Sequence, residues 1–212
     1  IWEMAARLLI PGGIACVNIG DALRSLNGDF RLYPNASRIV AAFSARGFHV
    51  LPRIIWRKST NAPNKFMGSG MLPGGAYVTL EHEHILVFRK GSKRPFATEG
   101  QKSLRRRSAY FWEERNRWFS DTWDLAGERQ RLEGMPGRER SGAFPLELAY
   151  RLICMYSVQG DLVLDPFLGT GTTSLAAAAA GRSSLAAEID PQLAGSALAQ
   201  LADECSVSAI TT

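Results

Sequence analysis

The chain has 212 residues, 46% of them hydrophobic, and a formal net charge of +5 at pH 7. This length and apolar content suffice for one sizeable core, while no uncharged apolar run is long enough to span a membrane. The three cysteines are scattered and none belongs to a CxxC pair, which argues against a zinc site and dithiol redox chemistry. Composition therefore predicts a globular cytoplasmic protein with no membrane partner.

The first 90 residues alternate turns with apolar segments. Residues 11–13, Pro-Gly-Gly, form a turn before a strand predicted over residues 14–19. A helix is predicted over residues 35–46, because apolar positions recur there at helical spacing and a glycine follows. Two further strands are predicted over residues 48–56 and 77–88.

The second of those strands carries a run of glutamates and histidines, from Glu81 to His84, that offers metal-ligating groups. Alternate residues of a strand face opposite sides, so the two histidines share one side and the two glutamates share the other. Two ligands without a third nearby seldom hold zinc. No metal site is therefore predicted.

The middle of the chain is strongly basic. Between residues 89 and 117, ten lysines and arginines stand against three glutamates, which gives +7 for the segment. A charge run alone is typical of a solvated surface, but aromatic residues are interleaved with these cations. That combination favours a nucleic-acid face, in which Arg105, Arg106 and Arg107 bind phosphates.

A glycine-containing turn follows the basic segment, in the sequence VLDPFLGTGTT at residues 163–173. An apolar run ending at Leu164 predicts a buried strand, and an alanine-rich run from Leu175 predicts the next helix. Gly169 and Gly171 let the backbone approach a ligand, and Asp165 ends the strand. A Walker loop needs Lys-Ser or Lys-Thr after its last glycine, and the dinucleotide pattern GxGxxG needs a third glycine. Both are lacking here.

Two acidic residues after the turn have different interpretations. A second strand ends on Glu188, about 20 residues beyond the glycines, which is the usual interval to an acid that holds ribose hydroxyls. Asp190 precedes Pro191 and a helical run, so it is interpreted as a helix N-cap. Upstream of the turn, Phe144 and Pro145 precede a predicted core helix, where they either staple its start or pack on an adenine ring.

Taken together, these segments resemble the β class of DNA amino-methyltransferases, which use S-adenosylmethionine. The shared motifs are DPFxGxGTT at residues 165–173, FPxxL at residues 144–148, and PGGxxxVNxGD at residues 11–21. A Trp-x-Lys at residues 56–58 and a His-Glu at residues 82–83 also match. The resemblance covers most of the chain outside the basic middle.

The resemblance implies a permuted order in one methyltransferase domain. Residues 1–90 would be the C-terminal part of the catalytic half, residues 91–141 a target-recognition insert, and residues 142–212 the cofactor-binding half. The implied fold is α/β, with a Rossmann-like class I methyltransferase sheet that is mostly parallel, has an antiparallel edge hairpin and lacks part of its central strands.

The resemblance also implies the binding residues. Those for the cofactor are Phe144, Pro145, Asp165, Pro166, Phe167, Gly169, Thr170, Gly171, Thr172 and Glu188. Those for double-stranded DNA are Lys58, Asn61 and Lys65, together with Arg105, Arg106 and Arg107. His82 and Glu83 are then either structural or close to the DNA. The implied reaction methylates cytosine N4 or adenine N6 of a flipped base, in a restriction-modification system with a cognate endonuclease.

One family motif is absent. Members carry Ser, Asp or Asn followed by Pro-Pro-Tyr before the helix that precedes the Pro-Gly-Gly turn, whereas this sequence has no adjacent prolines. We therefore assign no catalytic residue within residues 1–212, and we hypothesise that the tetrapeptide lies upstream of Ile1 and that this chain alone is inactive.

Three alternatives stay open at this point. The chain is either a clipped methyltransferase, one subunit of a split enzyme, or a non-catalytic DNA-binding module that kept the cofactor fold. RNA methylation shares the cofactor motifs, although the permuted order and the basic insert favour DNA. Carbon-5 methylation of cytosine needs a thiolate from a Pro-Cys pair, and none of the three cysteines follows a proline.

Overall fold

The computed structural model describes residues 2–58, 67–68, 72–127, 130–131, 139–140 and 143–204. The chain divides into two compact units. The sheet unit comprises Trp2–Arg94 and Phe119–Ala126, and the glycine-turn unit comprises Pro95–Trp118 and Gly127–Thr212. Among the described residues, no helix is both long and apolar enough to cross a membrane.

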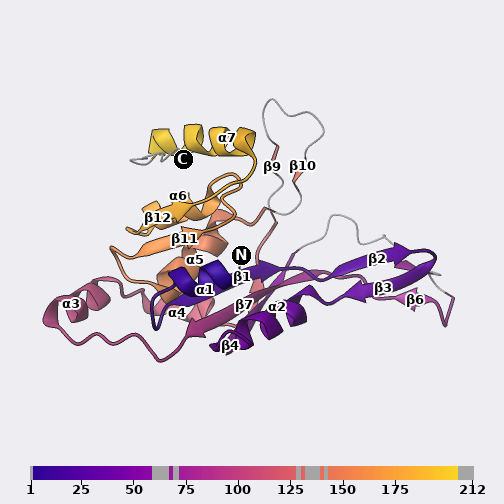
Figure 1. Ribbon diagram of the computed structural model, residues 1–212, viewed down its shortest axis with the longest axis horizontal. Coiled ribbons are helices and arrows are strands. Elements are labelled where there is room, and N and C mark those ends of the chain that lie inside the picture. Colours follow the sequence, from indigo (N-terminus) through magenta and orange to yellow (C-terminus); the bar gives the residue numbers. More distant parts are fainter. Residues whose placement is uncertain are drawn as a thin grey trace. The chain divides into compact units, whose positions relative to one another are not determined.

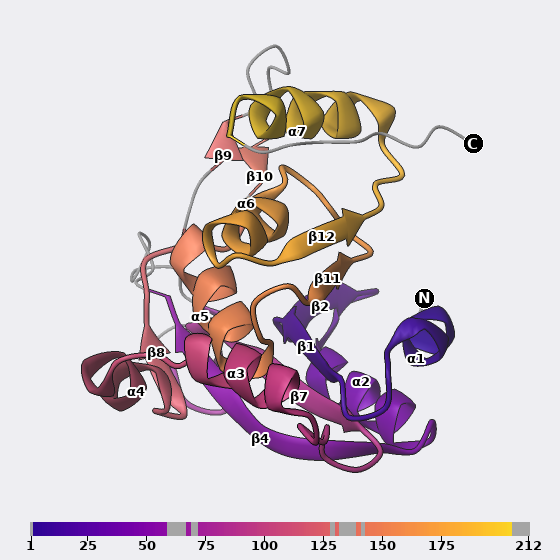
Figure 2. The ribbon, with the colours of Figure 1, turned by 90° about the vertical axis from the view of Figure 1, so that its left-hand side faces the viewer.

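The sheet unit is built on four strands in the order β1-β7-β4-β8. Figure 1 labels β1, β7 and β4, and Figure 2 labels β8. The β7 strand pairs antiparallel with β1 and with β4, whereas β8 pairs parallel with β4. A register shift between Leu51 and Ile54 spans Pro52, which has no N–H to donate to a neighbour. The strand bounds are β1 Ile14–Ile19, β4 Phe48–Arg57, β7 His82–Lys90 and β8 Thr122–Asp124.

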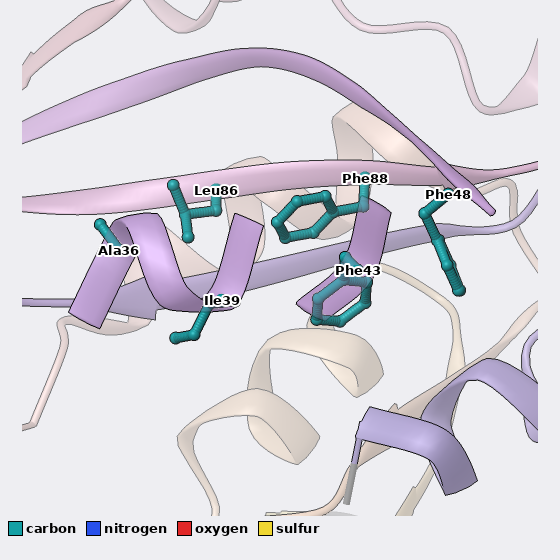
Figure 3. Packing of buried hydrophobic residues seen from close by; sticks show 6 residues of the cluster. All are labelled: Ala36, Ile39, Phe43, Phe48, Leu86 and Phe88. Atoms are coloured by element: carbon teal, nitrogen blue, oxygen red, sulfur yellow. The ribbon is translucent and has the colours of Figure 1, made fainter. Parts of the chain in front are cut away.

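One face of this sheet packs against α2 and forms the core of the unit. The Phe43 ring of α2 stacks on Phe88 of β7 with centroids 4.1 Å apart, and Phe48 meets Phe43 edge-on at 5.0 Å. Ile39 and Leu86 complete the contact (Figure 3). The remaining elements of the unit are α1 Trp2–Leu8, α2 Asn35–Ser44, the hairpins β2 Ala22–Leu26 with β3 Asp29–Tyr33, and β5 Met67–Gly68 with β6 Ala76–Tyr77.

The glycine-turn unit contains a parallel β-α-β arrangement (Figure 2). Strand β11, Leu162–Asp165, pairs in register with β12, Ser183–Ala186, and helix α6, Thr172–Ala179, connects them. Alanines of α6 pack against α5 in a small apolar cluster. The other elements are α3 Glu99–Arg107, α4 Trp112–Trp118, β9 Gln130–Arg131, β10 Glu139–Arg140, α5 Leu146–Tyr156 and α7 Pro191–Glu204.

A buried arginine fixes the ends of the two helices that pack together. Arg182, directly before β12, donates to the Ser157 carbonyl at 2.8 Å and to the Ser157 hydroxyl at 3.0 Å. It also donates to the Ala180 carbonyl. Ser157 and Ala180 are the C-caps of α5 and α6, so the guanidinium satisfies carbonyls that a helix leaves unpaired, where positive charge is favourable.

The α/β class and the parallel strands around the glycine turn are confirmed. The predicted helix at 35–46 is α2, ending at Ser44. The strand predicted over residues 77–88 is wrong at residues 78–81, because β6 ends at Tyr77 and β7 begins only at His82. In the described part of the chain, β1 and β11 each pair with one neighbour only. The three-part plan of residues 1–90, 91–141 and 142–212 stays a prediction, and residues 119–126 of its middle part belong to the sheet unit.

Candidate functional site

The glycine turn between β11 and α6 is held by backbone hydrogen bonds. Leu168 donates its N–H to the Ala187 carbonyl at 2.8 Å, and the Gly171 N–H donates to the Leu168 carbonyl at 2.9 Å. Gly169 and Gly171 have φ values of 57° and 88°, in the left-handed region that favours glycine. The two glycines therefore create the turn, as the sequence predicted.

Gly171 has a second reason to lack a side chain. A Cβ atom there would lie 3.3 Å from the Leu201 side chain of α7. Gly171 is also the N-cap of α6, and because it has no side chain it cannot cap that helix itself. The N-terminus of α6 thus lies at the glycine turn, where a helix favours a polar or anionic ligand.

Glu188 connects the end of β12 to the glycine turn. One carboxylate oxygen accepts the Gly169 N–H at 2.8 Å. The other accepts the N–H groups of Ile189 at 3.0 Å and Asp190 at 3.1 Å. These bonds hold the Glu188 carboxylate against the glycine turn, with three backbone N–H groups shared between its two oxygens.

Asp165, at the end of β11, lies on the same turn. Its carboxylate accepts the Phe167 N–H at 3.0 Å, which bends the chain through Pro166. The Phe167 ring is 55% exposed despite its size. Thr170 and Thr172 are half-buried, and Thr172 begins α6. The acid, the aromatic ring and the glycines predicted to act together therefore belong to one turn.

Phe144 and Pro145 lie at the start of α5 in the same unit. Pro145 is the N-cap of α5, and its carbonyl accepts the Leu148 N–H at 3.0 Å. Phe144 is half-buried and packs against the cluster that includes Ala176 and Ala177 of α6. The aromatic ring thus packs on the cluster that α5 and α6 share, while a role over the cofactor stays a prediction.

Asp190 caps α7, as predicted. Its carboxylate accepts the Gln192 N–H at 3.0 Å, and Pro191 takes the first helical position. The two neighbouring acids therefore differ in task, because Glu188 reaches the turn and Asp190 serves the next helix.

A polar cluster in the sheet unit joins family motifs that are distant in sequence. The Asn18 amide donates to one Glu83 oxygen at 2.6 Å, and Lys58 donates to the other. The Lys58 ammonium also lies 4.1 Å from the centroid of the buried Trp56 ring. Gly20 lets this cluster form, since a Cβ there would lie 3.3 Å from the Glu83 side chain.

This cluster changes the interpretation of Lys58. Its side chain is only 19% exposed and paired with Glu83, while its predicted contact with DNA stays a prediction. Asn61 and Lys65, the other candidates of that loop, lie outside the described residues. Asn18 Oδ1 is buried and has no hydrogen-bond partner within the described part of the chain.

The histidines of the same strand do not complete a metal centre. In the described residues, no three His, Cys, Asp or Glu side chains gather closely enough to hold a metal ion. Burial lowers the pKa of His84, and neighbouring His82 lowers it further, while Asp21 opposes the shift. His84 is therefore a neutral imidazole at neutral pH.

The three arginines predicted to bind phosphates form the last turn of α3, and all are exposed. Thr98 and Gln101 cap the start of this helix reciprocally, which fixes its N-terminal turn. Arg105 lies 5.0 Å from the Phe96 ring, and Arg106 is 3.6 Å from Glu99. The arginines are accessible to DNA, and phosphate binding stays a prediction.

The fold and the glycine turn define a class of cofactor-binding α/β protein, and comparison gives the family. Residues 1–198 match the N6/N4 methyltransferase family described as DNA methylase, so the chain belongs to that family.

Two curated relatives are type II methyltransferases. M.MthZI of Methanothermobacter thermautotrophicus is 60% identical over 90% of this chain and 54% of its own length. M.MjaI of Methanocaldococcus jannaschii is 52% identical over 91% of this chain and 62% of its own. The chain thus spans little more than half the length of these relatives.

Solved structures agree with the fold. A putative DNA modification methylase of Thermus thermophilus, TTHA0409, complexed with S-adenosyl-L-methionine, is 36% identical with a TM-score of 0.76, over 96% of this chain and 74% of that protein. The cytosine-N4-specific PvuII DNA methyltransferase has a TM-score of 0.64 at 19% identity over 92% of this chain and 66% of its own, which shows the fold alone.

Proposed function

We propose that this chain binds S-adenosylmethionine and double-stranded DNA as part of a methyltransferase acting on an exocyclic base amine, cytosine N4 or adenine N6. The observation that carries this proposal is the hydrogen bond from Gly169 to Glu188. It joins the glycine turn to the acid at the end of the next strand, in a chain of the DNA methylase family.

The residues of the turn fit this cofactor. Glu188, held against the turn after the second strand, is placed to accept a ribose hydroxyl, and the N-terminus of α6 suits the polar methionine end of the cofactor. The exposed Phe167 ring offers a flat apolar surface. Asp165, Pro166 and Thr170 shape the turn, while Phe144 and Pro145 at the start of α5 close over the adenine.

The bound cofactor would supply an electrophilic methyl group. An exocyclic amine is a poor nucleophile, because its lone pair is delocalised into the ring, so it must be held in line with that methyl group. The base must also leave the duplex, at a cost of about a few kcal/mol. In the family, the Pro-Pro-Tyr tetrapeptide accepts the amine hydrogens and stacks on the base.

Since this sequence has no adjacent prolines, we propose that the 212-residue chain does not transfer methyl groups by itself. A catalytic segment on the same polypeptide or on a partner subunit would complete it. The same absence supports the second candidate function, a non-catalytic DNA-binding module that retains the cofactor. A cytoplasmic location is a further proposal, and the type II designation of the relatives supports a cognate restriction endonuclease as another.

A labelled-methyl assay tests the function. The chain, and a version extended upstream to the next in-frame Pro-Pro-Tyr, are each mixed with duplex DNA and methyl-labelled S-adenosylmethionine. We expect both to bind the cofactor and only the extended version to give N4-methylcytosine or N6-methyladenine in the digested DNA. Cofactor binding by neither would contradict the proposal. If no such tetrapeptide lies upstream, the split enzyme or the binding module takes its place.

The first residue of that tetrapeptide would sharpen the outcome. Ser favours cytosine N4 as the target, whereas Asp or Asn favours adenine N6, by resemblance to the family. Mass spectrometry of the digested nucleosides distinguishes the two products directly.

A further inference from the structure

Two adjacent aromatic side chains are exposed at the start of α4. Phe111 is 77% exposed and Trp112 is 68% exposed. Tyr110 and Trp118, which flank this pair, are packed instead, whereas Phe119 is 49% exposed. Trp118 is 6% exposed and contacts both Tyr110, at 5.8 Å between ring centroids, and Tyr150, at 6.2 Å. The folded unit therefore buries some aromatics of the segment and leaves this aromatic pair, Phe111 and Trp112, in solvent.

Neither ring of the aromatic pair caps α4, of which Trp112 is the first residue. Phe111 stands immediately before α4, where Ser, Thr, Asp or Asn side chains usually cap the helix. Here the Glu114 carboxylate accepts the Phe111 N–H at 2.8 Å, so a polar residue at position 111 would serve that helix better. Two large adjacent rings that are exposed to water lower the solubility of a protein, and such exposed apolar patches are typical of binding surfaces.

The surroundings of the pair favour a polyanionic partner over an apolar one. The Arg115 guanidinium lies 5.2 Å from the centroid of the Trp112 ring. Between residues 105 and 117, five arginines stand against two glutamates, which gives +3. Aromatic residues and arginines are also enriched in protein interfaces, so it is the net positive charge around the rings that favours bases stacked beside phosphates.

We propose that the aromatic pair stacks on DNA bases while the neighbouring arginines hold the phosphates. This inference rests on the proposed function and adds a task to it. A flipped base leaves its neighbours unstacked, and a ring that covers them offsets part of that cost. Because every base has a flat face, the contact would add affinity with little sequence preference.

Tryptophan fluorescence gives a direct test. The other tryptophans are buried or half-buried, so acrylamide quenching of the free chain reports mainly on exposed Trp112. We expect a 20-base-pair duplex to protect that fraction from quenching. Unchanged quenching under conditions where the chain is bound to DNA would overturn the inference.

Substitutions separate stacking from folding and from charge. Trp112→Ala and Phe111→Ala should each weaken duplex binding roughly tenfold, while Trp112→Phe retains a flat ring and most of the affinity. The salt dependence of binding should not change, since no phosphate contact is removed. Val78→Ala, which trims an 80% exposed apolar residue of the sheet unit, is the control and should bind as the unsubstituted chain does.

The outcomes distinguish this inference from the proposed function. Equal DNA affinity of Trp112→Ala and the unsubstituted chain, with cofactor and DNA binding intact, would overturn only the aromatic pair. Absence of DNA binding by the unsubstituted chain would overturn both. Sedimentation without DNA tests whether the pair mediates self-association instead. If the unsubstituted chain self-associates and Trp112→Ala does not, the pair belongs to a protein interface and the inference is overturned.

Discussion

The glycine turn and the basic insert, residues 91–141, differ in how sequence specifies them. In the turn, Asp165, Gly169 and Glu188 have fixed places, because the two carboxylates accept backbone N–H groups and the glycine adopts a left-handed angle. In the insert, the signal is composition, and cations at many positions give a similar field. Geometry can therefore be predicted from a motif, whereas a charged surface needs the fold to show which side chains face outward.

The sharpest test of this contrast is Glu188→Ala. Three backbone N–H groups lose their acceptor, and so would the ribose hydroxyls. We expect the affinity for S-adenosylmethionine to fall roughly 100-fold and the free energy of unfolding to fall by about 1–3 kcal/mol. Calorimetric titration and urea unfolding measure the two effects.

Asp190→Ala is the matched control, since that acid caps α7 two residues further on. It should cost about 1 kcal/mol of stability and leave cofactor affinity unchanged. Equal losses of cofactor affinity in both variants would mean that Glu188 is only structural.

The next largest effect is expected for Asp165→Ala, which removes the acceptor of the Phe167 N–H. Cofactor binding should weaken about tenfold, as when one charged hydrogen-bonding partner is lost. Asp161→Ala removes a similar turn bond, to the Val158 N–H at 2.9 Å, before the same strand. A calorimetric affinity as high in Asp165→Ala as in Asp161→Ala would contradict the assignment.

In the insert, the expected effect is smaller and depends on salt. Replacing Arg105, Arg106 and Arg107 with Gln should weaken duplex binding several-fold near physiological salt. It should also flatten the plot of log affinity against log salt concentration by about 0.9 per lost phosphate contact. Counterion release predicts both the weaker binding and the smaller salt dependence. Fluorescence anisotropy over roughly 50 to 200 mM salt measures them.

Arg24, Arg38 and Arg46 of the sheet unit serve as the control for that variant, because they are also exposed arginines. The same slope change in this triple Gln variant would show that the response follows net charge and not the position of α3.

The smallest effect concerns pH. Because burial lowers the pKa of folded His84, the unfolded chain binds this proton first as pH falls through about 6.5, the ordinary pKa. Stability should therefore decrease as the solution is acidified through that value, and His84→Gln should show a smaller decrease in thermal midpoint. His49→Gln, at an exposed position, is the control. If the thermal midpoint of His84→Gln falls with pH as much as that of the unsubstituted chain, His84 does not contribute to the pH dependence of stability.

The sequence predicts best where neighbours along the chain determine the structure. The glycine turn, the Asp190 cap and helix α2 depend on adjacent residues, and all three are found. The partner of Lys58 could not be predicted, because Glu83 lies 25 residues away and meets it only through strand pairing. Likewise, no local pattern separates buried Trp118 from exposed Trp112, since their burial depends on how α4 and α5 pack.

We expect S-adenosylmethionine to bind at the turn formed by Gly169, Gly171 and Glu188. Amide NMR of the ¹⁵N-labelled chain during titration with the cofactor tests it most directly, because glycine amides resonate in a distinct region. We predict that the Gly169 and Gly171 signals shift with the same affinity that calorimetry gives. Saturation with cofactor while both glycine signals stay unchanged would place the cofactor elsewhere and contradict the account.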